Sequence, residues 1–546
     1  MMLARGHWRW PNCGWEAGNI SFKQSFAAGS MHLETELKFI GSEEAISQLR
    51  RSAELRRIAG NRRAHTRTLN AVYFDTENFA LRKAGLVLRV RSEGQSFVQT
   101  LKSSYRDDLA TRSEYKADVD SHTPDVSAIP DSRMRWRVSQ LLKGHTLKAI
   151  FEVETKRTRV LLTPKRGTEI EAAFDTGLIR YFDGDHAQSL PISEFELELL
   201  KGNVDDLFAT AHALTDELPV TLSLLAKSER GYGLARGEVG KPVQAKPVKL
   251  AESMTADDAL CVVIASCLHH LLGNWSAVTI DGDSEGIHQM RVALRRLRVA
   301  LSMLETPVQS PMAGLLEQAR ETAAVLGRAR DLDVFLEEII APVTEVYSDE
   351  RQLQELTSHV LARRRLAREQ VVAVLDSDGF RKFVLQLAAV TYQRPWLARA
   401  EHNDAVVRGA YDFSCAQLSY RLSRAMRTGE QIEDLDAQER HDLRIKLKKL
   451  RYTADFFGSL FSGKKVRRYL KRLSRLQQLL GDMNDAATAR ALVHNILVEQ
   501  RDREAPLDLA YAGGLVVGWH GSRSVKRSKA LKQKWRRFTK LKPFWV

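Results

Sequence analysis

The feature of this sequence that most restricts its fold is a change in the spacing of its apolar residues. From Leu33 to about Leu200, apolar residues recur at every second position, with turn residues such as Asp183 and Gly184 between the runs. That spacing is typical of β-strands with one buried face. Beyond residue 250 the spacing becomes the 3.6-residue period of helices, and proline is sparse. The sequence therefore predicts an α+β organisation, with a β domain followed by an all-α domain.

A few segments depart from these two patterns. Helical spacing interrupts the β region around Glu43 to Ile58 and again around Val204 to Leu214. The stretch from Gly237 to Leu250 holds two prolines among small and basic residues, which is typical of a linker. Residues 1–30 lack the continuous apolar stretch of a signal peptide, and regular alternation starts directly after Met31. We therefore expect translation to start at Met31, with residues 1–30 a disordered or non-native extension.

The helical region repeats itself. The segment from His288 to Arg298 returns as His441 to Arg451, and Leu326 to Asp331 is matched by Leu480 to Asp485. Such an internal repeat predicts two related helical bundles. The predicted domains are the extension at 1–30, the β domain at 31–236, the linker at 237–252 and the helical domain at 253–546, whose repeats span 253–400 and 405–546.

The net charge, the apolar runs and the cysteines of the sequence indicate what kind of partner the protein binds and where it is found. The formal net charge is +15, and most of the excess lies after residue 250. Such a charge favours a polyanion, which could be nucleic acid, an acidic membrane surface or a phosphate polymer. No apolar run reaches the roughly 18 residues of a membrane span, and the four cysteines show no disulfide or metal-ligand spacing. We expect a soluble protein of the reducing cytoplasm, with no membrane partner.

Charged residues alternate with apolar ones along several predicted strands. Glu34, Glu36 and Lys38 share one strand face, while Leu37 and Phe39 share the other. A single strand of this kind usually exposes its polar face to water. Faces with several like charges repel themselves, however, unless opposite charges or a metal lie across from them. If the strands close into a barrel with these faces inward, the resulting tunnel suits a metal-bound oligophosphate. The same alternation recurs at Arg89 and Arg91, at Thr100 and Lys102, and at Glu194, Glu196 and Glu198.

These motifs and their order along the chain resemble the CYTH family, also called triphosphate tunnel metalloenzymes, over about residues 31–235. The resemblance implies an antiparallel β-barrel tunnel with flanking helices, in which a metal-activated water hydrolyses inorganic triphosphate to diphosphate and phosphate. No covalent nucleophile is required. The segments that carry the resemblance are Glu34 to Lys38, Tyr73 to Thr76, Leu86 to Arg91, Thr100 to Lys102, Arg112 to Tyr115, Phe151 to Arg157, Ile170 to Asp175, Glu194 to Glu198 and Lys227.

The same resemblance implies roles for individual residues, although it leaves open which carboxylate orients the water. Ligands of Mg²⁺ or Mn²⁺ would be Glu34, Glu36, Glu194, Glu196 and Glu198. Triphosphate would be bound by Lys38, Arg89, Arg91, Lys102, Arg112, Arg157, Arg159 and Lys227. Glu114, Glu171 and Asp175 are the candidate catalytic carboxylates.

Basic residues line one face of several predicted helices. Helical spacing puts them on a common face, which is usually a solvated surface. Like charges at i and i+4 destabilise a helix by about 0.2–0.5 kcal/mol per pair, so repeated stripes favour an anionic ligand that offsets the repulsion. The stripes are His288, Arg291, Arg295 and Arg298, then His441, Arg444, Lys448 and Arg451, and thirdly Lys464, Arg468, Lys471 and Arg475.

The histidine-headed repeat, with the segment from Gly327 to Asp331 and Asp333 behind it, resembles a CHAD domain over about residues 253–546. This resemblance implies that inorganic polyphosphate binds in a basic groove between the two bundles. Asp331 and Asp485 are expected to orient neighbouring Arg or Lys side chains rather than to bind metal.

Other functions remain open from the sequence. The same tunnel could act on thiamine triphosphate, or cyclise ATP as adenylate cyclases do. A protein that only binds polyphosphate or nucleic acid is a third alternative, which the retained glutamates and basic residues of the strands disfavour. The stripes lack interleaved aromatic residues for base stacking, so nucleic acid is the less favoured polyanion. The preferred metal, the chain length and the oligomeric state do not follow from the sequence.

Overall fold

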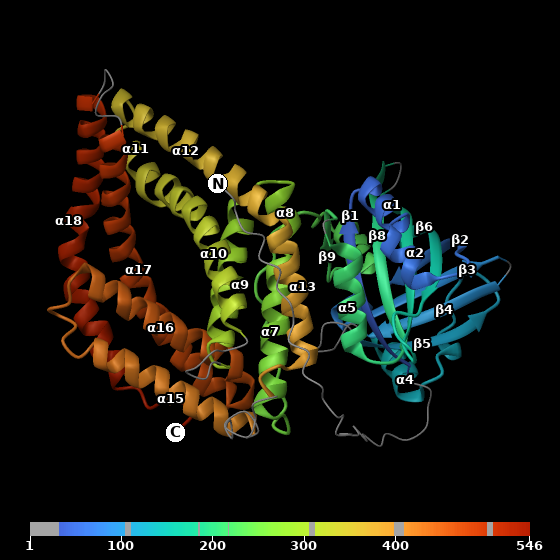
Figure 1. The fold of residues 1–546 in the computed structure, drawn as a ribbon. Coiled ribbons are helices and arrows are strands. Elements are labelled where there is room, and N and C mark those ends of the chain that lie inside the picture. The colour runs from blue at the N-terminus through green and yellow to red at the C-terminus, as the bar shows by residue number, and fades with distance from the viewer. Residues whose placement is uncertain are drawn as a thin grey trace.

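The computed structural model describes residues 32–94, 96–103, 111–183, 186–216, 218–304, 312–397, 409–499 and 506–546. The predicted extension at 1–30 therefore lies outside the described residues. Figure 1 shows a sheet-containing domain on one side of the molecule and a helical domain on the other. The predicted α+β organisation is confirmed.

The N-terminal domain is built on one nine-stranded sheet in which every pairing is antiparallel. The strand order is β5-β4-β3-β2-β6-β7-β8-β1-β9, and β1 also pairs with β5. The strands are β1 (His32–Gly41), β2 (His65–Asp75), β3 (Leu86–Glu93), β4 (Ser96–Ser103), β5 (Thr111–Val119), β6 (Lys148–Leu162), β7 (Glu169–Asp183), β8 (His186–Lys201) and β9 (Val220–Leu222).

Short helices surround this sheet. The predicted helix at 43–58 is two helices, because the Ser52 side chain accepts a hydrogen bond from the backbone of Leu55 and starts a second helix there. The helix predicted at 204–214 is present. The helices α4 (Ser132–Leu141) and α6 (Lys227–Ala235) were not predicted. Apolar residues on one sheet face, among them Phe39 and Phe195, form a common core with α1, α2 and α5. The helices are α1 (Glu43–Arg50), α2 (Ala53–Ala59), α3 (Ala80–Lys83), α4 (Ser132–Leu141), α5 (Val204–Thr215) and α6 (Lys227–Ala235).

The C-terminal domain is helical, as predicted. The two histidine-headed segments of the repeat lie on α9 and α16, which pack against each other. α9 also packs on α7 and α10, and α16 on α15 and α17. The helices are α7 (Ala256–Leu272), α8 (Trp275–Thr279), α9 (Ser284–Leu301), α10 (Ala313–Val334), a π-helix (Phe335–Ile340), α11 (Ala341–Thr344), α12 (Arg351–Leu375), α13 (Asp378–Gln393), α15 (Ala410–Thr428), α16 (Ala437–Phe457), α17 (Gly463–Glu499) and α18 (Pro506–Thr539).

The helix that begins at Ala256 is more apolar than we expected from the sequence, in which no continuous apolar run has the length of a membrane span. Among the described residues, the stretch Ala256–Thr279 is long and apolar enough to cross a membrane, and 67% of it is buried inside the protein. Leu260, Ile264 and Leu268 of α7 belong to the main core. Packing against α9 and α13 thus accounts for this apolar composition.

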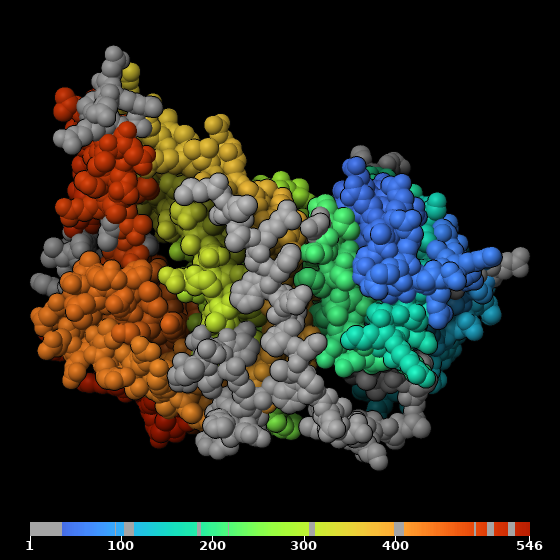
Figure 2. Space-filling view, in the orientation of Figure 1, coloured from blue at the N-terminus to red at the C-terminus, as the bar shows by residue number. Residues whose placement is uncertain are grey.

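The predicted linker is docked on the helical domain. Val243 exchanges two hydrogen bonds of 2.9 Å with the Asn274 side chain, and the Leu250 N–H donates to Ser459 Oγ at 2.9 Å. The sheet domain also touches α13, where the rings of Phe208 and Tyr392 lie 5.5 Å apart. The two domains therefore share a continuous apolar core, and Figure 2 shows α5 lying along the boundary between them.

Candidate active site and anion-binding surfaces

The strand register places the charged residues of the sheet on one shared face. Lys38 pairs with Glu196 across β1 and β8, and Arg157 pairs with Asp175 across β6 and β7. Directly opposite residues in an antiparallel sheet project to the same side. The apolar side chains of Ala71, Tyr73, Val87, Phe151, Val153, Ile179 and Ile192 follow the same alternation and form a separate core with Tyr232 of α6.

Three buried carboxylates meet on this face. Ligand oxygens of Asp175, Glu194 and Glu196 all lie within 4.8 Å of one another. Carboxylate oxygens are the ligands that Mg²⁺ and Mn²⁺ prefer. The donor set therefore fits a hard divalent cation, and three negative charges this close require positive charge nearby.

Basic side chains supply that positive charge. Lys227 Nζ lies 2.8 Å from Asp175 Oδ2, 2.6 Å from Glu194 Oε2 and 2.8 Å from Glu196 Oε1. Arg157 donates to both oxygens of Asp175, at 2.7 and 2.5 Å, and also to Glu196. Lys38 Nζ lies 3.3 Å from Glu196. These contacts offset the repulsion among the three carboxylates.

The same contacts keep the carboxylates ionised. Burial alone would raise the pKa of Glu196, but Lys227, Arg157 and Lys38 hold that pKa well below its ordinary value. The pKa of Glu194 is also lowered, because Lys227 and Lys38 outweigh the effect of burial. Ionised oxygens are available for a cation across the neutral pH range.

A second group of charges surrounds Glu114, which is buried. Lys116, Lys102 and Arg89 approach its carboxylate at 3.3, 3.4 and 3.7 Å. Burial would lower the pKa of Arg89, but Tyr73 and Glu114 raise it above its ordinary value. This cationic end of the face is suited to phosphate oxygens.

The remaining predicted residues are placed as follows. Arg159 lies 3.6 Å from Glu171, and Glu36 is opposite Glu198 in the register of β1 and β8. Burial would lower the pKa of Arg157, but the charges of Glu196 and Asp175, and after them that of Glu36, hold it well above its ordinary value. Arg91 is partly buried on β3. Among the described residues, Glu36 and Glu198 are not members of the close carboxylate group, and the side chains of Glu34 and Arg112 lie outside the described part of the structure.

Sequence reasoning missed Arg230, whose Nη1 lies 2.7 Å from Glu194 Oε1. It lies three residues after Lys227 on α6, so recognising this short helix would have revealed both cations on one face. α6 is anchored by the Tyr232 hydroxyl, which donates to Asp75 at 3.0 Å. A Cβ atom at Gly231 would lie 2.1 Å from the Phe151 ring, so only glycine permits this close approach.

In the helical domain, the first two basic stripes meet. Burial lowers the pKa of Arg295, and the nearby charges of Arg291 and Arg444 lower it further, although Tyr452 opposes them. Arg291 Nη1 lies 3.1 Å from Asp331, which orients it as predicted. Like charges held this close, on helices that pack together, favour an anion between them.

The two repeated histidines lie in different surroundings. Burial lowers the pKa of His288 to about 4, with a further contribution from Arg330, so its imidazole is neutral at pH 7. His441 Nδ1 lies 2.5 Å from Asn484 Oδ1. The Asp485 side chain lies outside the described part of the structure. The third stripe is exposed on α17 and comprises Lys464, Arg468, Lys471 and Arg475.

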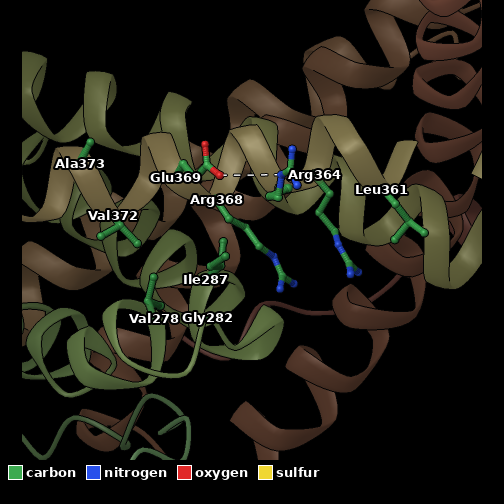
Figure 3. A pocket seen from close by; sticks show the side chains of 10 residues that line it. Val278, Gly282, Ile287, Leu361, Arg364, Arg368, Glu369, Val372 and Ala373 are labelled. Carbon is green, nitrogen blue, oxygen red and sulfur yellow. Dashed lines mark ion pairs between the residues drawn. The ribbon is translucent and has the colours of Figure 1, made fainter. Parts of the chain in front are cut away.

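A cavity of about 630 Å³ lies between α12 and the segment around Val278 and Ile287. Arg364 and Arg368 of α12 extend from its wall (Figure 3). Both arginines approach the buried Asp333, at 3.9 and 2.9 Å. Asp333 thus offsets part of their positive charge within the protein.

Comparison with known proteins identifies both halves of the chain. Residues 32–232 match the CYTH domain family and residues 262–494 match the CHAD domain family. An inorganic triphosphatase of Haemophilus influenzae is 35% identical over 167 residues, which is 30% of this chain and 45% of that protein. The match thus spans less than half of this relative's length.

Two further similarities extend over more of the chain. An uncharacterized protein of Mycobacterium tuberculosis is 25% identical over 488 residues, covering 84% of this chain and 88% of that protein. The crystal structure of the CHAD domain from the plant Ricinus communis is similar with a TM-score of 0.48 and 26% identity, covering 55% of this chain and 97% of that one. The chain therefore combines a CYTH domain with a CHAD domain, in that order.

Proposed function

We propose that the CYTH domain hydrolyses inorganic triphosphate to diphosphate and phosphate in a metal-dependent reaction. The observation that carries this proposal is the shared sheet face, on which the buried Asp175, Glu194 and Glu196 lie beside Lys38 and Arg157. One face thereby offers oxygen ligands for a cation and positive charges for phosphate oxygens. The β1–β5 pairing would complete a tunnel around this face.

The carboxylates fit Mg²⁺ or Mn²⁺. Asp175, Glu194 and Glu196 would hold the ion, and Glu34, Glu36 and Glu198 are proposed to complete or extend the site. When bound, a divalent ion of this kind acidifies water and offsets charge on transferred phosphoryl groups.

The basic residues would bind the triphosphate along its length. Among the described residues, the partners of Lys227 are carboxylates, so it can turn from them to phosphate oxygens when a cation takes over the carboxylates. At the other end of the face, the cations around Glu114 would bind further phosphate oxygens. The proposed substrate-binding set is Lys38, Arg89, Arg91, Lys102, Arg112, Arg157, Arg159 and Lys227.

Glu114, Glu171 and Asp175 are the proposed carboxylates for orienting the attacking water. Glu171 is the least constrained, since Arg159 lies 3.6 Å from it and both side chains are partly exposed. Asp175 is bound by Arg157 and Lys227, and Glu114 by several cations. This difference favours Glu171 as the group free to accept a hydrogen bond from water.

A phosphate-release assay would test the proposed activity. The full-length protein is incubated with tripolyphosphate, ATP or thiamine triphosphate, each with Mg²⁺ or Mn²⁺. We expect tripolyphosphate to give the highest kcat/KM, since the described face offers charges for phosphate and no aromatic pocket for a base was recognised in the sequence. Preferred release from ATP or thiamine triphosphate would replace the proposed substrate, and no release from any of the three would refute a hydrolase.

We also propose that the CHAD domain binds inorganic polyphosphate along the stripes on α9 and α16, and that the protein acts in the cytoplasm. The closely spaced Arg291, Arg295 and Arg444 support polyanion binding. Reversing the charges of Arg291, Arg295, Arg444 and Lys448 should remove most polyphosphate binding and leave triphosphate turnover nearly intact. A matched control reverses the exposed Arg50, Arg51, Arg62 and Arg63 of the CYTH domain. Equal losses in both variants would contradict the assigned surface.

A further inference from the structure

A second cluster of basic residues lies where α15 packs near α9 and α16. It comprises Arg298 near the end of α9, Arg421 and Arg424 on α15, and Lys449 on α16, and is called the α15 cluster below. Of these residues, the sequence analysis singled out only Arg298. The cluster combines residues from three helices, so it is recognisable only in the folded chain.

The cluster has a buried base and an open rim. Arg421 is only 7% exposed, and its Nη2 lies 3.3 Å from Oγ of Ser302, the residue that directly follows α9. Arg424 and Lys449 are exposed at the surface. Arg424 donates to the Tyr420 hydroxyl at 3.1 Å and lies over that ring. A ligand in solvent can therefore reach the rim while Arg421 provides charge from below.

The positive charges of this cluster are only partly offset within the described residues, where the carboxylate of Glu317 acts on Arg298. Burial lowers the pKa of Arg421 to about 10, and Arg424 lowers it further, whereas Tyr420 opposes them. Burial also lowers the pKa of Lys449, followed by the charges of Arg421, Arg298 and Arg424. Within the described ranges, no salt bridge of 4.0 Å or less joins a member of the cluster to a carboxylate.

Two other basic groups in the domain are paired with carboxylates. Arg291 is paired with Asp331, and Arg368 of the cavity in Figure 3 is paired with Asp333. Burying cations beside one another without an anion is unfavourable. An external anion is the group that would offset the repulsion in the α15 cluster.

The cluster lies close to the proposed polyphosphate surface. Arg298 follows Arg295 by one helical turn on α9, and Lys449 directly follows Lys448 on α16. At a rise of about 1.5 Å per residue, Arg298 is about 5 Å along the helix axis from Arg295. A linear anion bound by the stripes can therefore continue to the cluster without leaving these helices.

We propose that the α15 cluster is a second phosphate-binding subsite, which extends the binding path for long inorganic polyphosphate. This inference rests on the proposed polyphosphate binding of the CHAD domain. Phosphates at one end of a long chain would contact Arg424 and Lys449 at the rim, with Arg421 beneath. A polyphosphate molecule that reaches only the stripes would not gain these contacts, so the subsite favours longer polyphosphate.

The test uses the full-length protein and the double variant Arg424→Gln/Lys449→Gln. Both residues are exposed, so the fold should be retained and the melting temperature should not fall. Dissociation constants for long-chain polyphosphate are measured at several salt concentrations. The matched control, Arg427→Gln/Lys540→Gln, removes the same charge from exposed positions outside the cluster.

We expect the slope of log K against log salt to become shallower by about 1.4 in the cluster variant, since each phosphate contact of a single-stranded polyanion contributes roughly 0.7. The control should keep the wild-type slope, and both variants should keep wild-type turnover of tripolyphosphate. A cluster variant with the same slope and affinity as the control would overturn the subsite. Failure of the wild-type protein to bind polyphosphate, or an effect seen only with single-stranded RNA, would instead refute the proposed ligand of the domain.

Discussion

At the scale of single residues, Lys227 has the most consequential position. Its ammonium group contacts Asp175, Glu194 and Glu196, the same carboxylates that fit a divalent cation. The lysine and a bound metal would therefore compete for one set of oxygens. The sequence singled out Lys227 and the three carboxylates as site residues. Their contact, however, depends on the pairing of β7 with β8 and on the docking of α6.

Replacing Lys227 with methionine should separate its effect on the stability of the metal-free protein from its effect on metal binding. Removing one partner of a buried ion pair costs about 3–5 kcal/mol, so the metal-free variant should melt at a lower temperature. The uncompensated carboxylates should bind Mn²⁺ more tightly, so Mn²⁺ should raise the melting temperature of the variant more than that of the wild type. Lys165→Met, which removes an exposed pair with Asp206, is the control. An equal Mn²⁺ effect in both proteins would contradict the competition.

We expect the neutral His288 to make the proposed polyphosphate binding dependent on pH. Its folded pKa of about 4 lies below the ordinary 6.5, because of burial and the charges of Arg330, Arg295 and Arg291, with Glu285 opposing them. The unfolded chain therefore binds more protons between pH 6.5 and 4, and stability falls as the pH falls through this window. A bound polyanion favours the protonated imidazole, so affinity should rise as the pH falls from 6.5. Titrations should show this rise in the wild type, and its persistence in His288→Asn would assign it to another group.

At the scale of elements, α6 connects the site to the apolar end of the sheet face. It carries Lys227 and Arg230 toward the carboxylates, while Tyr232 packs against Phe151 and donates to Asp75. Sequence periodicity failed here because α6 spans little more than two turns, too few to show a helical period. The alternating strands were predicted because each carries several repeats of the two-residue pattern.

The close packing of α6 predicts different results for two neighbouring glycines. Gly231→Ala places a methyl group against the buried Phe151 ring, which should cost about 1–3 kcal/mol and displace the basic end of the helix. Gly233→Ala meets nothing closer than 3.8 Å and should be neutral or stabilising. Chemical denaturation and triphosphate turnover measured on both variants test this contrast. Equal stability and activity of the two variants would show that α6 is not held as described.

At the scale of the whole molecule, the docked linker and the contacts of α13 unite the two domains. Val248 and Leu250 of the linker are buried in the main core, which includes residues of both domains. Proline and small residues predicted a linker but not its docking, because composition reports local conformation and not what a segment packs against. The internal repeat, by contrast, was visible in the sequence because each copy of the motif lies within a single helix, where its residues keep the same spacing.

The shared core predicts cooperative unfolding. Calorimetry of the full-length protein should show one transition, and a fragment of residues 31–236 should melt at a lower temperature because it exposes Phe208 and Leu222, which pack in the shared core. Two independent transitions in the full-length protein, with the fragment matching one of them, would show that the interface contributes little stability.

The central claim is that the charged sheet face performs metal-dependent hydrolysis of triphosphate. The most direct measurement is the initial rate of phosphate release from tripolyphosphate as Mn²⁺ is titrated, for the wild type and Glu196→Gln. We predict a saturable rise from a negligible rate in the wild type and almost no rate in the variant, since Glu196 belongs to the close carboxylate group and also contacts Lys38, Arg157 and Lys227. A wild-type rate that is unchanged when the metal is chelated, or a Glu196→Gln titration that matches the wild type, would contradict the account.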